Sequence, residues 1–352
     1  MTMILGLETS CDETAAAVVE DGWLVRASVV ASQHHLHERY GGVVPEIASR
    51  AHLERLNPVV DATLQAAKVK LNEIDAIAVG NRPGLIGSLL VGVSAAKTLA
   101  WATGKPLLGI DHIHAHLYAA GLSDFTDSKS EISNPVSTPQ PLYPALGLVV
   151  SGGHTSLYEL TSPTELRLLG RTIDDAVGEA YDKAAVILDA GYPGGPKLDR
   201  LAQTGDAGIR RFPRSMLGGD SLDFSFSGLK TSLLYAVRDT GGMLSDRQRA
   251  DFAAAFQDAA IDALVRKLER ALGMLAAASR PACAVIIGGG VSANSLLRRQ
   301  VAELGARCNL PTHIPAMKYC VDNAAMIAGL AYEHLRGGNL GDLALPAVTA
   351  GG

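Results

Sequence analysis

Two histidines four residues apart suggest a metal site. They are His112 and His116, in the run Asp-His-Ile-His-Ala-His. On a helix these two imidazoles share one face and could reach one ion, whereas His114 points roughly the other way. The alternative is a pair of helix histidines satisfied by hydrogen bonds. No glutamate follows His112, so the general base of the HExxH motif is missing and a metalloprotease is disfavoured.

A carboxylate usually completes such a histidine pair, and Asp322 is the candidate. It stands at the start of a predicted late helix, where the alternative role is to cap the helix. Both roles can be filled if Asp322 binds the metal and another group caps the backbone. We expect Asp322 to approach the histidines from across a cleft between two halves of the chain.

The polar turn from Thr9 to Thr14 carries two more acids, Asp12 and Glu13. They follow a strand-like apolar run, in a turn of small residues that could approach a phosphate. The two carboxylates could hold a metal, orient water or accept a proton. Capping of the turn is an equally good explanation for Asp12.

Two glycine-rich loops are candidate nucleotide-binding segments. Ser151-Gly152-Gly153-His154-Thr155 follows an apolar strand, and its small residues would let backbone N–H groups approach an anion. Gly288-Gly289-Gly290 opens towards a helix, with Asn294 placed to bind a base or a sugar. The second loop is neither GxGxxG nor a Walker P-loop. A ligand-free tight turn remains an alternative for both loops.

A polar segment in mid-chain runs from Thr172 to Lys183. We expect Asp175, Glu179, Asp182 and Lys183 to lie within one short helix, where a solvated face with an i,i+4 ion pair is the alternative to a binding role. Further along, Gly195 and Asp199 could join Asp182 in binding sugar hydroxyls.

The elements that position these residues form two similar series. Residues 4–8, 15–19 and 23–30 read as three strands joined by a polar turn and an Asp-Gly hairpin. Residues 145–150, 156–160 and 165–169 repeat that arrangement. Each series is followed by a strand, a glycine-rich loop and a helix, at 74–102 and at 284–304. The pattern predicts a duplicated α/β fold with two lobes and a cleft between them.

We place the N-terminal lobe at residues 1–111 with 323–345 and the C-terminal lobe at 112–322. Residues 121–143, rich in Ser, Thr, Asp and Pro, are expected to form an inserted surface loop. Residues 250–278 are expected to form one or two long helices, and the tail from Gly337 is expected to be loose.

Composition narrows the class of protein. The chain has 352 residues, 47% of them hydrophobic, which suits two lobes with a large core. A net charge of −5 argues that any RNA contact is a local basic patch or comes from a partner. The four cysteines match no zinc module and suggest reduced core thiols. No signal peptide and no apolar run of transmembrane length is evident, so we expect a cytoplasmic protein without a membrane anchor.

A set of motifs occurs together in the order of one family. The motifs are GLETSCDET, EIASRAH, NRPGLIGSLLVG, DHIHAH, LVVSGGHT, TIDDAVGEAYDKAA, YPGGP, FSFSGLKT, GGGVSAN and DNAAM. From about Ile4 to Arg336 the chain resembles the bacterial tRNA threonylcarbamoyladenosine transferases of the universal TsaD family. The resemblance implies an actin-like ATPase, Hsp70 and sugar-kinase fold of two duplicated lobes with a nucleotide cleft between them.

The resemblance also implies the reaction. The threonylcarbamoyl group would pass from threonylcarbamoyl-AMP to N6 of the adenosine just 3′ of the anticodon, in tRNAs that read codons beginning with A, with release of AMP. One divalent metal ion per subunit, iron foremost and zinc as the alternative, would be held by His112, His116 and Asp322. Asp12 matches an important acidic position, and we take it as the candidate general base. The adenylate-binding positions would be Val149, Val150, Ser151, Gly152, Gly153, Asp182, Gly195, Asp199 and Asn294.

Family members work with a paralogous dimerisation subunit and a small ATPase, so the resemblance implies these partners beside tRNA. Arginine and lysine pairs at 210–211, 266–267 and 298–299, with Arg214, are candidate tRNA phosphate contacts, although solvated surface charge is the simpler explanation. Two departures stand out: Ala324 replaces a glycine found in some members, and the 121–143 loop is longer. The alternatives are a small-molecule kinase of the same fold, a carbamoyltransferase with another acceptor, or a scaffold subunit without activity.

Overall fold

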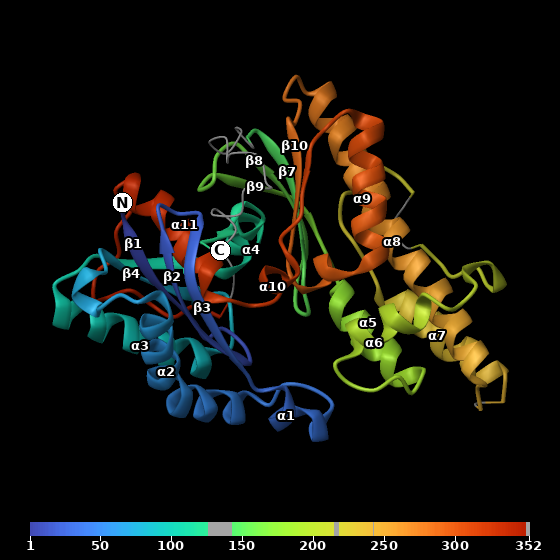
Figure 1. The fold of residues 1–352 in the computed structure, drawn as a ribbon. Coiled ribbons are helices and arrows are strands. Elements are labelled where there is room, and N and C mark those ends of the chain that lie inside the picture. The colour runs from blue at the N-terminus through green and yellow to red at the C-terminus, as the bar shows by residue number, and fades with distance from the viewer. Residues whose placement is uncertain (126–142, 215–217, 242, 350–352) are drawn as a thin grey trace. The chain divides into compact units, whose positions relative to one another are not determined.

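The computed structural model describes residues 1–125, 143–214, 218–241 and 243–349 (Figure 1). The chain forms two compact units. Unit 1 comprises Met1–Pro141 and Pro315–Gly352, and unit 2 comprises Leu142–Ile314. The boundaries predicted at 111/112 and 322/323 were wrong, because helix α4 (His112–Tyr118) packs against helix α11 (Ala324–Arg336) within unit 1.

Unit 1 is built on a six-stranded sheet in the order β5-β4-β1-β2-β3-β6. Strand β1 pairs antiparallel with β2 and parallel with β4, and all of its residues after Met3 are buried, as expected for a central strand covered on both faces. Asp21 and Gly22 both have positive φ angles, 49° and 82°, which confirms the predicted Asp-Gly hairpin between β2 and β3. The strands are β1 (Met3–Glu8), β2 (Glu13–Glu20), β3 (Leu24–Ser32), β4 (Ala76–Arg82), β5 (Leu107–Asp111) and β6 (Ser123–Asp124).

Helices cover both faces of this sheet, because alternate residues of its strands point to opposite sides. Leu5 and Leu7 of β1 pack with α2 (Pro45–Ala67) and α3 (Ile86–Thr103), whereas Ile4 packs with α11. A β-carbon on Gly6 would lie 2.5 Å from the carbonyl oxygen of Ala324, so α11 sits directly against the β1 backbone. Short elements join these parts: α1 (His34–His37), η1 (Glu38–Tyr40), η2 (Leu71–Glu73), η3 (Ala119–Gly121) and α10 (Met317–Cys320).

Unit 2 is built on a five-stranded sheet in the order β11-β10-β7-β8-β9. The strands are β7 (Ala145–Val150), β8 (Thr155–Leu160), β9 (Leu166–Arg171), β10 (Ala284–Gly288) and β11 (Thr312–His313). The helices and 3-10 turns are α5 (Val177–Ile187), α6 (Gly194–Ala202), η5 (Ala207–Ile209), α7 (Ser227–Asp239), α8 (Asp246–Ala277), η6 (Gly290–Ala293) and α9 (Ser295–Cys308).

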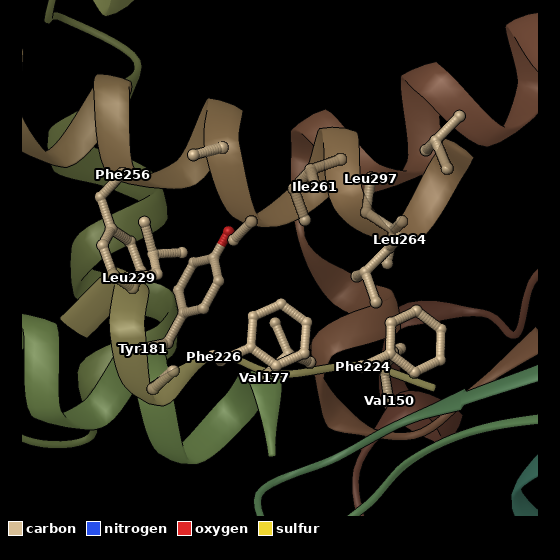
Figure 2. Close-up of a cluster of buried hydrophobic side chains, with 14 of the residues drawn as sticks. Val150, Val177, Tyr181, Phe224, Phe226, Leu229, Phe256, Ile261, Leu264 and Leu297 are labelled. Atoms are coloured by element: carbon tan, nitrogen blue, oxygen red, sulfur yellow. The ribbon is translucent and has the colours of Figure 1, made fainter. Parts of the chain in front are cut away.

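Apolar side chains from these helices form the core of unit 2 (Figure 2). Tyr181 of α5 meets Phe256 of α8 edge to face, with ring centroids 5.5 Å apart, and Phe226 and Phe224 continue the cluster on the other side of Tyr181. Helix α8 is one continuous helix, which begins with a capping box at Ser245. Within this core α5 packs against α6 and α7, α6 packs against α8, and α8 contacts β7, so the helices are joined to the sheet through α8.

The two units share one topology. In each, two antiparallel pairings are followed by two parallel ones, so β1 to β5 of unit 1 correspond to β7 to β11 of unit 2. The predicted α/β duplication of the actin-like ATPase type is therefore confirmed. It arises because both halves present the same order of two antiparallel hairpin pairings followed by two parallel crossover strands.

Three expectations outside the sheets were wrong or incomplete. The tail is bound to unit 1, since the Val348 N–H donates to the Asn81 carbonyl and Gly341 bridges to Leu107. Of the expected loop at 121–143, residues 123–124 form strand β6, and residues 126–142 lie outside the described residues. Among the described helices, α3 is long and apolar enough to cross a membrane, but it packs on β4 and α2.

Candidate functional site

Helix α4 places the two candidate histidines on one face. The helix starts at His112 because the Asp111 side chain caps it, accepting hydrogen bonds from the N–H groups of Ile113 (2.9 Å) and His114 (3.3 Å). His116 lies one turn later, and its ring centroid is 4.6 Å from that of His112. Both rings are buried, so the pair faces the inside of unit 1.

Asp322 lies between α10 and α11 and faces the histidines. Its Oδ1 atom is 3.4 Å from His112 Nε2 and 3.2 Å from His116 Nε2. The side chain of Asn323 caps α11 by accepting from the Met326 N–H at 3.0 Å, so Asp322 is not needed as the cap. One ligand atom from each of the three side chains lies within 4.8 Å of the others. The expected approach across a cleft was wrong, because all three residues belong to unit 1.

Sequence reasoning missed a fourth member of this group, Glu8 at the end of β1. Its carboxylate is completely buried, and Oε2 lies 3.0 Å from His112 Nδ1. Its other oxygen accepts a hydrogen bond from the Ser10 N–H at 2.5 Å. A carboxylate on Nδ1 leaves Nε2 facing Asp322, which is the arrangement that orients metal-binding histidines. The available signal was an acid at the end of a buried strand, next to the polar turn.

The charges of the group are strongly coupled. Burial would lower the pKa of His112, but the carboxylates of Asp322 and Glu8 raise this pKa well above its usual value. Burial lowers the pKa of His116, which is therefore neutral at pH 7. Burial would raise the pKa of Asp322, but the two histidines hold it well below the ordinary value.

The group fits a divalent cation. The Nδ1 atom of His116 is buried and has no hydrogen-bond partner among the described residues, and its Nε2 atom faces the Asp322 carboxylate at 3.2 Å. Buried polar atoms are rarely left in this state, and a neutral imidazole beside a carboxylate supplies two ligands that zinc and iron prefer. His112, His116 and Asp322 would hold the ion, and Glu8 would orient His112.

Asp12 and Glu13 also lie in unit 1, and both are buried. Burial, together with the nearby carboxylates of Asp322 and Asp12, raises the pKa of Glu13 to about 8, although the hydrogen bond with His34 acts to lower it. The polar turn therefore places Asp12 and Glu13 close enough to Asp322 for the charges of these carboxylates to interact.

The loop after β7 has the form of an anion-binding turn. The Ser151 N–H donates to the His154 carbonyl at 2.8 Å, and Gly178 at the start of α5 donates to the Ser151 carbonyl. β-Carbons on Gly152 and Gly153 would meet no other described atom within 4 Å, so packing within unit 2 does not require these glycines. Val149 and Val150, by contrast, are fully buried strand residues, and only their backbone can face a ligand.

The loop after β10 lies beside this turn. Gly289 has a φ of 92°, and a β-carbon there would lie 2.4 Å from the Val150 carbonyl oxygen. The tight-turn explanation is therefore correct for Gly289. Because the carboxyl ends of the parallel strands β7 and β10 meet here, this edge of the sheet is where ligands bind in open α/β folds.

Asn294 and Asp199 are joined by hydrogen bonds. Asn294 Nδ2 donates to Asp199 Oδ1 at 3.2 Å and to Gln257 Oε1 at 2.8 Å, and Gln257 Nε2 donates to Asp199 Oδ1 at 3.0 Å. Gln257 was missed by sequence reasoning, although a lone buried amide in the alanine-rich face of α8 is a signal. Asn294 also caps α9 through Leu297.

Asp182 lies in the middle of α5, and Gly195 lies in the first turn of α6. Asp182 Oδ1 accepts from the Gly194 N–H at 2.9 Å, which fixes the start of α6, and a β-carbon on Gly195 would meet no other described atom within 4 Å. The structure thus brings together Asp199 on α6 with Asn294 before α9, and Asp182 on α5 with the start of α6.

The charged segment before α5 has a structural role. Helix α5 begins at Val177, so Asp175 lies outside it, contrary to the prediction. Asp175 accepts from Lys183 at 3.0 Å and from Lys230 at 2.8 Å, and Glu179 pairs with Lys183 at 2.7 Å. These contacts match the alternative of an ion-paired face.

The candidate tRNA-contacting cations differ in accessibility. Lys267 is almost completely buried and donates to the Ser221 carbonyl, and Arg214 pairs with Asp258 and Asp262, so neither is available to a phosphate. The residues at 210–211 are exposed.

A family model described as TsaD, tRNA N6-adenosine threonylcarbamoyltransferase, matches residues 24–329. The chain belongs to this TsaD family. The protein of that name from Moorella thermoacetica is 47% identical over 95% of this chain and 93% of its own length. The one from Trichlorobacter lovleyi is 48% identical over 99% of this chain and 96% of its own.

Solved structures support the fold of this TsaD family member. HypF from T. kodakarensis aligns with a TM-score of 0.59 at 15% identity, over 96% of this chain and 48% of its own. Component A of the (R)-2-hydroxyglutaryl-CoA dehydratase from Acidaminococcus fermentans aligns with a TM-score of 0.52 at 13% identity, over 96% and 100%. At these identities the likeness concerns the actin-like ATPase fold alone.

Proposed function

We propose that this TsaD family member transfers a threonylcarbamoyl group from threonylcarbamoyl-AMP to N6 of the adenosine just 3′ of the anticodon, in tRNAs that read codons beginning with A. The products are threonylcarbamoyladenosine in the tRNA and free AMP. The observation that carries the proposal is near-full-length similarity to proteins of that name, the first at 47% identity.

The residues of unit 2 suit the adenylate part of the donor. The N–H groups of Gly152 and Gly153 can donate to its phosphate, and open space lies over both residues. Asp199 Oδ1 already accepts from Gln257, Asn294 and the Ser295 hydroxyl, whereas Oδ2 accepts from the Ser295 N–H and has a lone pair left for a ribose hydroxyl.

The residues of unit 1 suit the metal. A divalent ion bound by His112, His116 and Asp322, iron or zinc, would stabilise negative charge that develops on the donor. Glu8 keeps His112 Nε2 directed towards Asp322. This part of the proposal predicts one ion per subunit at this site.

The transfer forms a C–N bond and breaks the bond between the carbonyl carbon and the phosphate oxygen. The amine loses one proton, and AMP leaves with the bonding electron pair. We assign the acceptance of the proton to Asp12, which is 7% exposed and has a buried Oδ2 atom without a hydrogen-bond partner among the described residues.

The test is transfer of radiolabelled threonylcarbamoyl from the purified adenylate to unmodified tRNA, with the partner subunits added stepwise. We expect wild type to form the modified nucleoside. His116→Ala and Asp12→Ala should lose at least about 100-fold of the rate, the usual contribution of such groups. Full activity of Asp12→Ala would exclude its role as the base, and absence of transfer by the complete wild-type system would overturn the function.

The partners in this proposal are tRNA, a paralogous dimerisation subunit and a small ATPase, in the cytoplasm. Because the chain carries a net charge of −5 and tRNA is an anion, we expect partner subunits to supply part of the positive tRNA-binding surface. Affinity purification of the tagged chain from an extract of its own cells, with both partner subunits co-purifying, checks this set of partners.

A further inference from the structure

Unit 1 holds a second group of ligand-type side chains, in which the proposed reaction assigns a role to Asp12 but none to Glu13 or His34. Asp12 and Glu13 stand at the start of β2, and His34 opens α1 after β3. Backbone pairing brings them together, since Glu13 is the register partner of Ser32 and the Gln33 N–H donates to the Asp12 carbonyl at 3.1 Å. The fold therefore places the His34 side chain beside the two acids.

The distances suit a single ion. His34 Nε2 is 3.2 Å from Glu13 Oε1 and 3.8 Å from Asp12 Oδ2, and one ligand atom of each residue lies within 4.8 Å of the others. Tetrahedral zinc with ligands at about 2.0–2.1 Å requires ligand atoms about 3.3 Å apart. The observed separations need only small side-chain adjustments to meet that value.

The two acids are buried without enough positive charge. Asp12 is 7% and Glu13 9% exposed, and among the described residues their ion pairs are with His34 alone. The Oδ2 atom of Asp12 is buried, directed towards this group, and has no hydrogen-bond partner among the described residues. Buried carboxylates usually pair closely with a cation or bind a metal, whereas the 3.8 Å from this oxygen to His34 Nε2 is too long for a hydrogen bond, so the oxygen lacks a close positive partner.

A network of buried side chains fixes the turn that carries these acids. His52 Nε2 donates to the Cys11 carbonyl at 3.1 Å, and its Nδ1 accepts from the Thr14 hydroxyl at 2.8 Å. Gln33 contacts both His52 and His37. Such support beneath a ligand set holds it in place and is typical of metal sites.

We propose that Asp12, Glu13 and His34 form a second divalent metal site, separate from the group of His112, His116 and Asp322. One imidazole and two carboxylates suit zinc or manganese, and the half-exposed His34 leaves a path from solvent. A cation here would occupy one oxygen of Asp12, so the metal-bound and the proton-accepting forms of Asp12 are alternative states of one side chain.

The test counts metal ions rather than turnover. Full-length chain stripped of metal is dialysed against Zn²⁺, and bound zinc is measured by inductively coupled plasma mass spectrometry. His34→Ala should bind one equivalent less than wild type, and so should Glu13→Gln. The matched control His35→Ala, an exposed neighbour on the same short helix, should keep the wild-type stoichiometry.

A second readout separates this site from the first. In Co²⁺-loaded protein, His34→Ala and His116→Ala should each remove a different part of the visible absorption, and the double variant should remove both. Equal zinc stoichiometry in wild type and His34→Ala would overturn the proposal. Loss of an equivalent in His35→Ala as well would also overturn it, because the effect would then not be specific to His34. Neither result bears on the transfer reaction.

Discussion

The variant Glu8→Gln tests whether Glu8 orients His112 for metal binding. Glu8 uses both oxygens as acceptors, one for the Ser10 N–H at 2.5 Å and one for His112 Nδ1 at 3.0 Å. A glutamine of the same shape has only one acceptor oxygen, so one contact must become donor against donor. Either the turn at Ser10 shifts, or His112 loses the partner that keeps Nε2 directed towards Asp322.

The expected loss of metal affinity follows from the usual contribution of a carboxylate that is hydrogen-bonded to a metal-binding histidine. Removal of the hydrogen-bonding partner of a metal-bound histidine costs about 10- to 100-fold in metal affinity, or about 1.4–2.7 kcal/mol. We expect the Zn²⁺ dissociation constant of Glu8→Gln to rise by this factor, measured by competition with a chromophoric chelator. His116→Ala should lose more, because it removes a ligand.

Glu20→Gln is the matched control. Glu20 is also a buried acid of the same sheet, at the far end of β2, and it pairs with Arg26. This variant should retain wild-type zinc affinity even if its stability falls. A folded Glu8→Gln protein with zinc affinity within about threefold of wild type would refute the positioning role of Glu8.

Three further predictions concern stability. Gly6→Ala should destabilise by about 1–3 kcal/mol, seen in urea unfolding, because its β-carbon would lie 2.5 Å from the Ala324 carbonyl oxygen; an unchanged midpoint would contradict the close packing of α11 on β1. Asn323→Ala should cost about 1 kcal/mol through loss of the cap; an unchanged unfolding midpoint would contradict the capping role of Asn323. Burial would raise the pKa of Asp174, but hydrogen bonds from the loop before α7 hold it below the ordinary value. The ionised Asp174 carboxylate therefore stabilises the fold at pH values above the ordinary carboxyl pKa, and this stabilisation is lost as the pH falls through the lower pKa of the folded state. In Asp174→Asn, the free energy of unfolding should therefore fall less steeply as the pH is lowered.

The sequence determined much of the fold. Apolar runs of strand length, turn residues and glycines repeat in the same order, and these local features gave both sheets and the duplication. The His112/His116 spacing placed both imidazoles on one face, because that relation depends only on the period of a helix.

The unit boundaries and the polar partners required the tertiary structure. Helix α4 was assigned to the wrong lobe because local periodicity does not show which sheet a helix packs against. The contact of Glu8 with His112 spans 104 residues, and that of Gln257 with Asn294 spans 37. Such pairs depend on sheet order and helix packing, and the spacing of residues along the chain does not reveal either.

The His112/His116 pair separates what the sequence determined from what only the tertiary structure decided. The sequence by itself determined that His112 and His116 share a face and that Asp322 precedes a helix. Only the tertiary structure decided that Asn323 takes the cap, that Asp322 is left to face both imidazoles, and that Glu8 lies behind His112. The physical reason is that β1, β5 and α11 meet in one unit, and their ends converge because the sheet pairs β1 with β4 and β4 with β5.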